Sequence, residues 1–239
     1  RLLDGIKPSV VINCSGITLR NPEAASTISS ITINALLPHQ ILSWCKANGA
    51  RTIQFSTVCV FDGKDGNYNE DFPPNAQDVY GRTKSLGDLI DPQALTIRSS
   101  FIGRELQAGT ELLEWFLSQR GKRIKGFRRA IFTGVTTSVM ADTVADIIER
   151  FPALSGLYHL SSEVISKHDL LVLLRDACQA DVEIIPDDEF VCKRDLDDRR
   201  LRQAIGFSPP SWKQMAADLA GESTTYAAWR REDPLCPSK

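Results

Sequence analysis

The sequence predicts an α/β protein built on a doubly wound parallel sheet. Three observations lead to this prediction. Short apolar runs suit buried strands, amphipathic stretches alternate with them, and loops rich in Gly, Pro, Asn and Asp lie between. The 239 residues are 42% hydrophobic and 24% charged, which is typical of a globular protein with a substantial core.

The first half of the chain alternates strands with helices. Residues 10–14 form a continuous apolar run, which suits a strand buried on both faces. A helical stretch follows over residues 22–48, with a kink near Pro38 and a stop at Gly49. The other elements expected here are a strand at 52–56, a loop at 62–78, a helix at 80–90 and a strand at 94–99.

The second half contains more helices and forms a smaller lobe that is interleaved with the sheet. The expected helices lie at 110–120, 141–151, 167–179, 197–205 and 211–219, and the expected strands at 156–161 and 182–185. We therefore expect a sheet domain over residues 1–105 and a second lobe over 106–239. Residues 156–162 are expected to return to the main sheet.

Composition excludes several classes of function. A formal net charge of -2 provides no general attraction to nucleic acid or to an anionic membrane, and no apolar run is long enough to span a bilayer. The three histidines are scattered without metal-ligand spacing, so no metal site is expected. The six cysteines show no Cys-x-x-Cys spacing and lie mostly in apolar stretches, which predicts buried thiols in a reducing, cytoplasmic compartment.

Tyr80 and Lys84 carry the clearest chemical signal. At this spacing the two side chains share one face of a helix, where an ammonium can lower the pKa of a phenol. Thr57, at the end of the preceding strand, can hold a substrate oxygen beside that phenol. Such a trio suits the interconversion of a carbonyl and an alcohol. The alternative is an exposed helical pair that contributes a few tenths of a kcal/mol, about the usual value.

The residues around this trio resemble the extended short-chain dehydrogenase/reductase family. Within it, the similarity is to the dTDP-4-dehydrorhamnose reductase group of nucleotide-sugar reductases. The motifs that carry the resemblance are STVCVFDG at 56–63, Pro73-Pro74, VYGRTK at 79–84, PSVVINCSG at 8–16, LTIRSSF at 95–101, LYHLS at 157–161, SKHDL at 166–170 and DLD at 195–197. It covers nearly the whole chain.

The resemblance implies a role for individual residues. The catalytic residues are Thr57, Tyr80 and Lys84. The cofactor-binding residues, for NADP or NAD, are Cys14, Ser15, Gly16, Asn34, Ser56, Tyr80, Lys84, Ser99, Ser100 and Phe101. The substrate-binding residues are Thr57, Val58, Arg128 and Arg129. The alternatives are a solvated helix residue at Asn34, an ordinary turn at 14–16 and a solvated charge run at 120–129.

Two departures from the family pattern bear on function. Val58 and Cys59 follow Thr57, where nucleotide-sugar dehydratases have Asp-Glu and the rhamnose-forming reductases usually have Asp-Tyr. A dehydratase is therefore disfavoured. The second departure is that no Gly-rich cofactor fingerprint occurs and the chain opens at Arg1, near the family's fourth strand. We expect either a fragment or a natural homologue that has lost this loop, with weak binding of NAD(P) in both cases.

The expected activity is NAD(P)-dependent reduction of a keto group on a nucleotide-activated sugar. Residues 1–105 then supply a partial Rossmann-type cofactor and catalytic domain, and residues 106–239 mainly bind substrate. Two alternatives remain open at this point. One is a nucleotide-sugar 4-epimerase, and the other is a non-catalytic family member, similar to the regulatory subunit of eukaryotic methionine adenosyltransferase. A homodimer is one assembly that the sequence leaves open.

Overall fold

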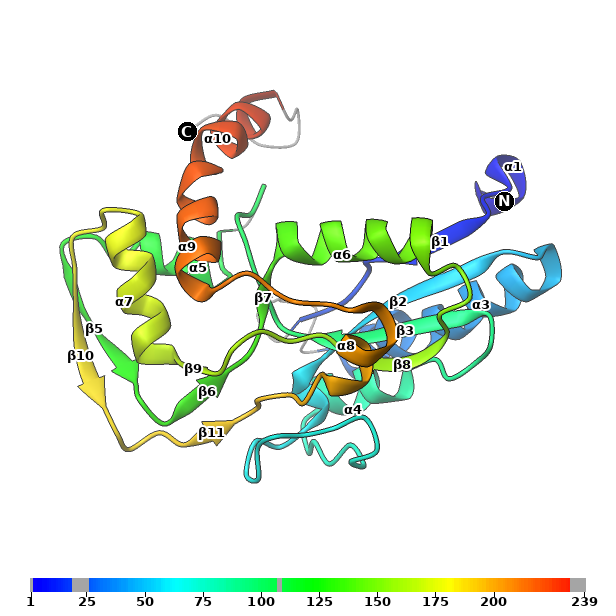
Figure 1. The fold of residues 1–239 in the computed structure, drawn as a ribbon, viewed down its shortest axis with the longest axis horizontal. Coiled ribbons are helices and arrows are strands. Elements are labelled where there is room, and N and C mark those ends of the chain that lie inside the picture. The colour runs from blue at the N-terminus through cyan, green and yellow to red at the C-terminus, as the bar shows by residue number, and fades with distance from the viewer. Residues whose placement is uncertain (1, 19–25, 107–108, 233–239) are drawn as a thin grey trace.

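A four-stranded parallel sheet is the centre of the protein in the computed structural model, which describes residues 2–18, 26–106 and 109–232 (Figure 1). The strands run in the order β1, β2, β3, β8, with the bounds Val10–Asn13, Arg51–Thr57, Ala94–Ser99 and Gly156–His159. Asn13 is the register partner of Gln54, and Ile97 that of Tyr158. The predicted α/β fold with a parallel sheet is confirmed.

Helices cover both faces of this sheet. In Figure 1, α6 (Thr137–Arg150) lies over one face, while α3 (Leu37–Asn48) and α4 (Val79–Leu86) lie over the other. Thr136 caps α6, because its hydroxyl accepts the Val139 N–H, and Val144 and Ile147 bury the face that meets the sheet. Gly49 ends α3 at a φ of 67°, a conformation that glycine adopts without strain.

The N-terminal elements differ in detail from the prediction. After α1 (Leu2–Ile6), β1 is the edge strand of the described sheet, so Ile12 is 42% exposed and the expected burial of this strand on both faces is wrong. The helical stretch before Gly49 consists of α2 (Thr27–Ser30), a π-helix η2 (Ile31–Leu36) and then α3. The expected helical residues 22–25 lie outside the described residues.

The second group of elements packs beside the sheet. Its strands are β4 (Phe101–Ile102), β5 (Lys122–Phe127), β6 (Ala130–Phe132), β7 (Val135–Thr136), β9 (Ile165–Ser166), β10 (Val182–Asp187) and β11 (Cys192–Lys193). Its helices are α5 (Leu112–Leu117), α7 (Lys167–Ala177), α8 (Arg199–Ile205), α9 (Trp212–Gly221) and α10 (Ser223–Glu232). Parallel pairing joins β10 to β5, and β6 lies between β11 and β9. One hydrophobic core continues from Ile53 and Leu95 in the sheet to Leu170 and Met215 in this group.

Strand β5 was not predicted because charged residues occupy three of its six positions. Arg123 and Lys125 point to solvent and pair with Glu183 and Asp187 on β10, at 2.8 Å in both cases. Hydrophobic periodicity therefore gives no signal over this segment. Two helices are also shorter than expected, because α4 ends at Gly87 and α5 spans only Leu112–Leu117.

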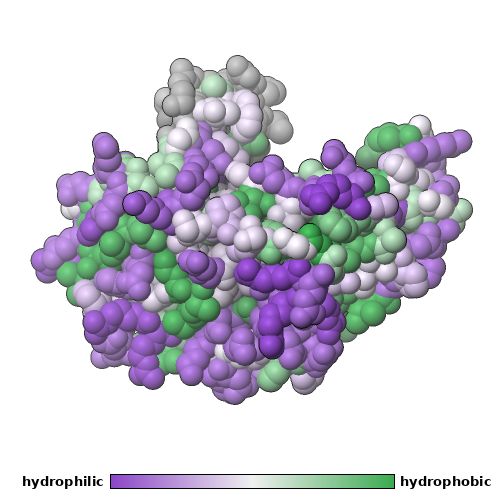
Figure 2. All heavy atoms as spheres, viewed as in Figure 1, coloured by the Kyte–Doolittle hydropathy of each residue, from purple (hydrophilic) through white to green (hydrophobic). Residues whose placement is uncertain are grey.

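The surface is mainly polar. Figure 2 shows polar side chains over most of the face in view, with hydrophobic side chains in small separate patches. Within the described ranges, no helix combines the length and the apolar character that crossing a membrane requires. Among the thiols of these residues Cys45 is buried, but Cys14 is exposed because it follows the end of β1, so the prediction of a buried thiol is wrong there.

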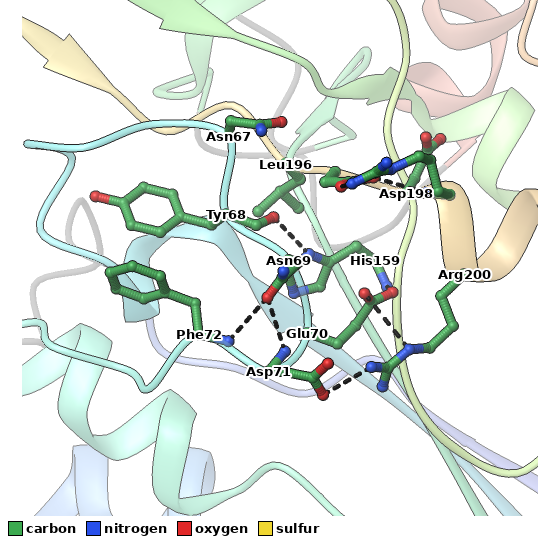
Figure 3. A network of polar contacts seen from close by, with 12 residues as sticks. Asn67, Tyr68, Asn69, Glu70, Asp71, Phe72, His159, Leu196, Asp198 and Arg200 are labelled. Atoms are coloured by element: carbon green, nitrogen blue, oxygen red, sulfur yellow. Dashed lines mark hydrogen bonds and ion pairs between the residues drawn. The ribbon is translucent and has the colours of Figure 1, made fainter.

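A loop after β2 is held against the C-terminal half of the chain. Tyr68 bridges Leu196, since the Tyr68 N–H donates to the Asp195 carbonyl at 3.0 Å and the Asp197 N–H donates to the Tyr68 carbonyl at 2.8 Å. Figure 3 shows Arg200 directed towards this loop, where it pairs with Asp71 at 2.7 Å. The ring of Tyr68 stacks on Phe61 with centroids 4.2 Å apart.

His159 makes two further hydrogen bonds to this loop. Its backbone N–H donates to Oε1 of Glu70 at 2.9 Å, and its side-chain Nδ1–H donates to the Tyr68 carbonyl at 3.1 Å (Figure 3). The side chain is fully buried, and burial, reinforced by the Arg98 charge, lowers the pKa of His159 to about 3. His159 is therefore neutral in the folded protein.

The depressed pKa of His159 predicts a pH-dependent stability. Below the unfolded pKa of 6.5 the unfolded state binds a proton that the folded state refuses until about pH 3. His159 should thus lower the free energy of unfolding by up to about 1.4 kcal/mol per pH unit as the pH falls through this window. Urea unfolding of wild type and His159→Gln at pH 7 and pH 5 measures the difference. His39→Asn is the control, and equal pH dependence in wild type and His159→Gln would contradict the assignment.

Candidate active site

The carboxyl ends of three parallel strands open into a cavity of about 940 Å³. Cys14, Ser15 and Gly16 follow β1, Thr57 ends β2, and Ser99 ends β3, and all of them line the cavity. Ligands of open α/β sheets bind at this edge, because the loops after the strands diverge there.

Thr57 is fixed at the junction of β2 and a 3₁₀ turn, η3 (Val58–Val60). Its Oγ1 accepts the Cys59 N–H at 3.1 Å, which caps this turn. The residue is 8% exposed and lines the cavity. The Thr57 hydroxyl lies near the Tyr80 phenol and acts to lower the Tyr80 pKa.

Tyr80 stands in the first turn of α4. Asp78 caps this helix, because its Oδ1 accepts the Gly81 N–H at 2.8 Å. The helix packs so closely on η3 that a Cβ at Gly81 would lie 2.2 Å from the Cys59 carbonyl oxygen, so only glycine fits. Burial raises the pKa of Tyr80 to about 12, against the lowering effect of the Thr57 hydrogen bond. The phenol is therefore protonated at neutral pH.

Lys84 lies one turn later and is only 6% exposed. Its Nζ donates to the Phe55 carbonyl at 2.7 Å. Burial lowers the pKa of Lys84, and the charge of Asp88 opposes this effect. The Lys84 ammonium therefore hydrogen-bonds to β2. Burial is the largest influence on the Tyr80 pKa and raises it. The expectation that Lys84 lowers the pKa of Tyr80 is not met.

Asn34 does not line the cavity but supports the loop that does. It is fully buried in the π-helix η2, where its Oδ1 accepts the Ile17 N–H at 2.8 Å and its Nδ2 donates to the Ile17 carbonyl at 3.0 Å. Its Nδ2 also lies 3.3 Å from the Thr83 hydroxyl on α4. Asn34 thereby ties the loop after β1 to the helix that carries Tyr80 and Lys84. Short π-helices are frequent at functional sites.

The structure separates the other predicted residues into two groups. The residues that line the cavity are Cys14, Ser15, Gly16, Ser56, Val58, Ser99, Ser100 and Phe101. Arg128 and Arg129 do not line it. Instead, Arg128 pairs with Asp188 on the surface, and Arg129 Nη1 reaches the Asp188 carbonyl at 3.5 Å.

Four other cations and several aromatic rings line the cavity, and sequence analysis missed them. They are Arg104, Lys125, Lys167, Arg194, Trp115, Phe127 and Phe190. Lys125 belongs to the basic segment at 120–129, where hydrophobic periodicity gave no sign of the strand that carries it. Arg194 carried no motif signal, and its Nη1 lies 3.4 Å from the Cys59 sulfur, two residues after Thr57.

The arrangement combines a proton donor with cationic side chains in one cavity, which Glu105 and Glu111 also line. A protonated phenol beside a hydroxyl can donate to an oxygen that develops negative charge. Guanidinium and ammonium groups can bind phosphate oxygens. A cavity of this kind fits a ligand that carries both a polar reacting group and phosphates.

Comparison with known proteins places the chain in a family. Residues 1–224 match the family described as the RmlD substrate binding domain. A dTDP-4-dehydrorhamnose reductase from Aggregatibacter actinomycetemcomitans is 24% identical over 244 residues, which cover 91% of this chain and 82% of that protein. Methionine adenosyltransferase 2 subunit beta from Xenopus tropicalis is 25% identical over 195 residues, which cover 74% of this chain and 56% of that protein.

The fold is also shared with solved structures. The crystal structure of dTDP-4-dehydrorhamnose reductase from Bacillus anthracis in complex with NADP superposes with a TM-score of 0.79 at 20% identity, and covers 93% of this chain and 83% of that one. With the family match spanning nearly all of the sequence, the chain belongs to the RmlD substrate-binding-domain family.

Proposed function

We propose that the protein is an NAD(P)-dependent oxidoreductase that reduces a keto group on a nucleotide-activated sugar. The observation that carries this proposal is the convergence of Thr57, Tyr80 and Lys84 on one cavity that four cationic side chains also line. The similarity to dTDP-4-dehydrorhamnose reductases supports it. The direct test is a screen of the purified protein with NADH and NADPH against a panel of nucleotide 4-keto sugars.

In this mechanism the chain's residues handle the proton and the position of the substrate. Tyr80 donates its phenolic proton to the oxygen of the keto group as that oxygen gains charge. Thr57 donates a hydrogen bond to the same oxygen, and Lys84 places its positive charge beside the site. Bound NADH or NADPH supplies the hydride.

The residues around the carboxyl ends of the strands fit a nicotinamide cofactor. Asn34 holds Ile17, which follows the loop at 14–16, and the Lys84 side chain lines the cavity, where its ammonium could meet a ribose hydroxyl. Residues 1–105 would hold the cofactor and the catalytic groups, while residues 106–239 would mainly hold substrate. A cytoplasmic location and a homodimer stay predictions.

For the substrate we propose that the phosphates bind Arg104, Lys125, Lys167 and Arg194, in preference to Arg128 and Arg129. The first four line the cavity, although Arg104 pairs with Glu114 at 3.1 Å and Lys125 with Asp187 at 2.8 Å, whereas Arg128 pairs with Asp188 outside the cavity lining. Val58 also lines the cavity and presents an apolar side chain next to Thr57. The sugar at this point would therefore receive no hydrogen bond from the side chain of Val58.

A binding subunit without catalysis is the second candidate, and the similarity to methionine adenosyltransferase 2 subunit beta favours it. The two candidates differ in what the cavity must do. A reductase turns over a keto sugar in the screen, whereas a binding subunit leaves the cofactor unchanged. The retained Thr57, Tyr80 and Lys84 support the reductase.

Replacing the proton donor should nearly abolish turnover. We expect Tyr80→Phe to lower kcat for reduction by at least about a hundredfold, because a positioned general acid contributes about that factor or more. Steady-state oxidation of NADPH at saturating keto sugar is the measurement. Tyr158→Phe, at a tyrosine outside the cavity lining, is the matched control. Near-normal turnover of Tyr80→Phe would rule out its role as the acid.

The raised pKa of Tyr80 predicts opposite pH profiles for the two directions. With a pKa of about 12, Tyr80 stays protonated from pH 6 to 9, so its donation keeps kcat for reduction level over this range. Alcohol oxidation needs the phenolate, so its kcat should rise about tenfold per pH unit in the same range. Initial rates in both directions test this, and a tenfold loss of reduction between pH 7 and 9 would contradict it.

The choice of phosphate-binding residues predicts a contrast between two arginines. Arg194→Ala should raise the KM for the nucleotide sugar about tenfold or more, because a charged hydrogen bond contributes about 1.5 kcal/mol or more. Its kcat should change less. Arg128→Ala removes an equal charge from the surface and should leave KM within about twofold. Equal effects of the two substitutions would show that the cavity cations do not bind substrate.

A further inference from the structure

We propose that Gln54 is a positioning residue that links the buried Lys84 to the loop after β1. It acts through a continuous chain of hydrogen bonds that runs across the first two strands of the sheet. The inference rests on the proposed reductase function, since both ends of this chain lie at the proposed cofactor site. It concerns a residue that neither lines the cavity nor belongs to the catalytic trio.

Four hydrogen bonds make up this chain. The Ser15 N–H donates to Asn13 Oδ1 at 3.1 Å, and Asn13 Nδ2 donates to Gln54 Oε1 at 2.7 Å. Gln54 Nε2 then donates to the Phe55 carbonyl at 2.9 Å. That carbonyl is the acceptor for Lys84 Nζ at 2.7 Å. Ser15 and Lys84 both line the cavity, so the chain joins two of its walls from behind.

The two side-chain amides can be oriented in only one sense. A backbone N–H can only donate, so the Asn13 oxygen must face Ser15 and its nitrogen must face Gln54. A backbone carbonyl can only accept, so the Gln54 nitrogen must face Phe55. The three bonds from Ser15 to the Phe55 carbonyl therefore run in one direction, so that each polarises the next. Lys84 Nζ donates to the same carbonyl oxygen, where the chain ends.

The opening of the sheet explains why the Phe55 carbonyl is available. The Arg51 N–H donates to the carbonyl of Ser9, the residue before β1, and alternate residues of a strand face the same neighbour, so Phe55 also faces the β1 side. However, β1 ends at Asn13, the register partner of Gln54, and its chain then turns away. Gln54 takes one lone pair of the freed carbonyl, which confines Lys84 Nζ to the other.

Packing alone does not require amides at these positions. Gln54 is 1% exposed and Asn13 is 4% exposed, in strands where β-branched residues pack well. Burying two amides is favourable only when each hydrogen bond is made. Asn34 secures the other end of the same loop at Ile17. The loop after β1 is thus held by one amide at each end, and Gln54 connects the first of these to Lys84.

Four variants test the proposal. Gln54→Leu removes both of the glutamine's bonds at similar volume, and Asn13→Ala removes the link to Ser15. The double variant completes the cycle. Thr96→Val is the matched control, because Thr96 is the register partner of Gln54 on β3, is fully buried and loses two hydrogen bonds to Leu89, a residue outside the cavity lining. Gln54→Met replaces Gln54→Leu should the latter fail to fold.

Two readouts do not require turnover. Amide hydrogen exchange at Ser15, followed by NMR, should become about fivefold faster in Gln54→Leu, which corresponds to one hydrogen bond of ordinary strength. The double variant should be no faster than Asn13→Ala. Acetylation of Lys84, normalised to the exposed Lys64 by peptide mass spectrometry, should accelerate several-fold in Gln54→Leu. Neither rate should change in Thr96→Val beyond the effect of its lower global stability.

Kinetics supply the third readout. We expect Gln54→Leu to lower kcat on the order of tenfold, because a small displacement of catalytic groups has effects of this size or larger. Unchanged Ser15 exchange and Lys84 acetylation in Gln54→Leu, or strictly additive effects in the double variant, would overturn the proposal. A wild-type protein without reductase activity would instead contradict the proposed function, because the exchange and acetylation results stand independently of it.

Discussion

The buried ammonium of Lys84, which lines the cavity, is the constraint on which the rest of the site depends. Lys84 is 6% exposed, and a charge in such a place is stable only when its neighbours compensate for the lost water. The Phe55 carbonyl provides a hydrogen bond and Asp88 provides an opposite charge. Asp88 is itself buried and requires Arg98, whose Nε and Nη2 both donate to one carboxylate oxygen at 2.9 and 2.7 Å.

Further contacts extend outward from the buried Asp88–Arg98 ion pair. The Arg98 guanidinium lies over the Phe61 ring at 5.4 Å from its centroid, and Phe61 stacks on Tyr68. Tyr68 in turn meets Leu196 and His159 (Figure 3). The loop that follows Thr57 is therefore packed between the catalytic sheet and the segment that leads to α8. This contiguous packing explains how the Lys84 charge is kept away from solvent.

The fold was largely predictable because its signals are local. Apolar runs for β2 and β3, the loop at 62–78 and the glycine stop at Gly49 depend on neighbouring residues alone. Elements that depend on distant partners were missed or misjudged. Charged β5 is a strand because β10 pairs with it, and β1 is half-exposed because it lies at the edge of the described sheet.

For the site, the spacing of Tyr80 and Lys84 on one helix face and the position of Thr57 at a strand end follow from local sequence, since helix periodicity and strand length are properties of short segments. Which cations line the cavity depends on the fold, because Arg104, Lys125, Lys167 and Arg194 come from segments far apart in the chain. The fold also decides that Asn13 meets Gln54 and that Lys84 meets Phe55. Those contacts follow from strand register and from the packing of α4, which side-chain spacing along the chain does not encode.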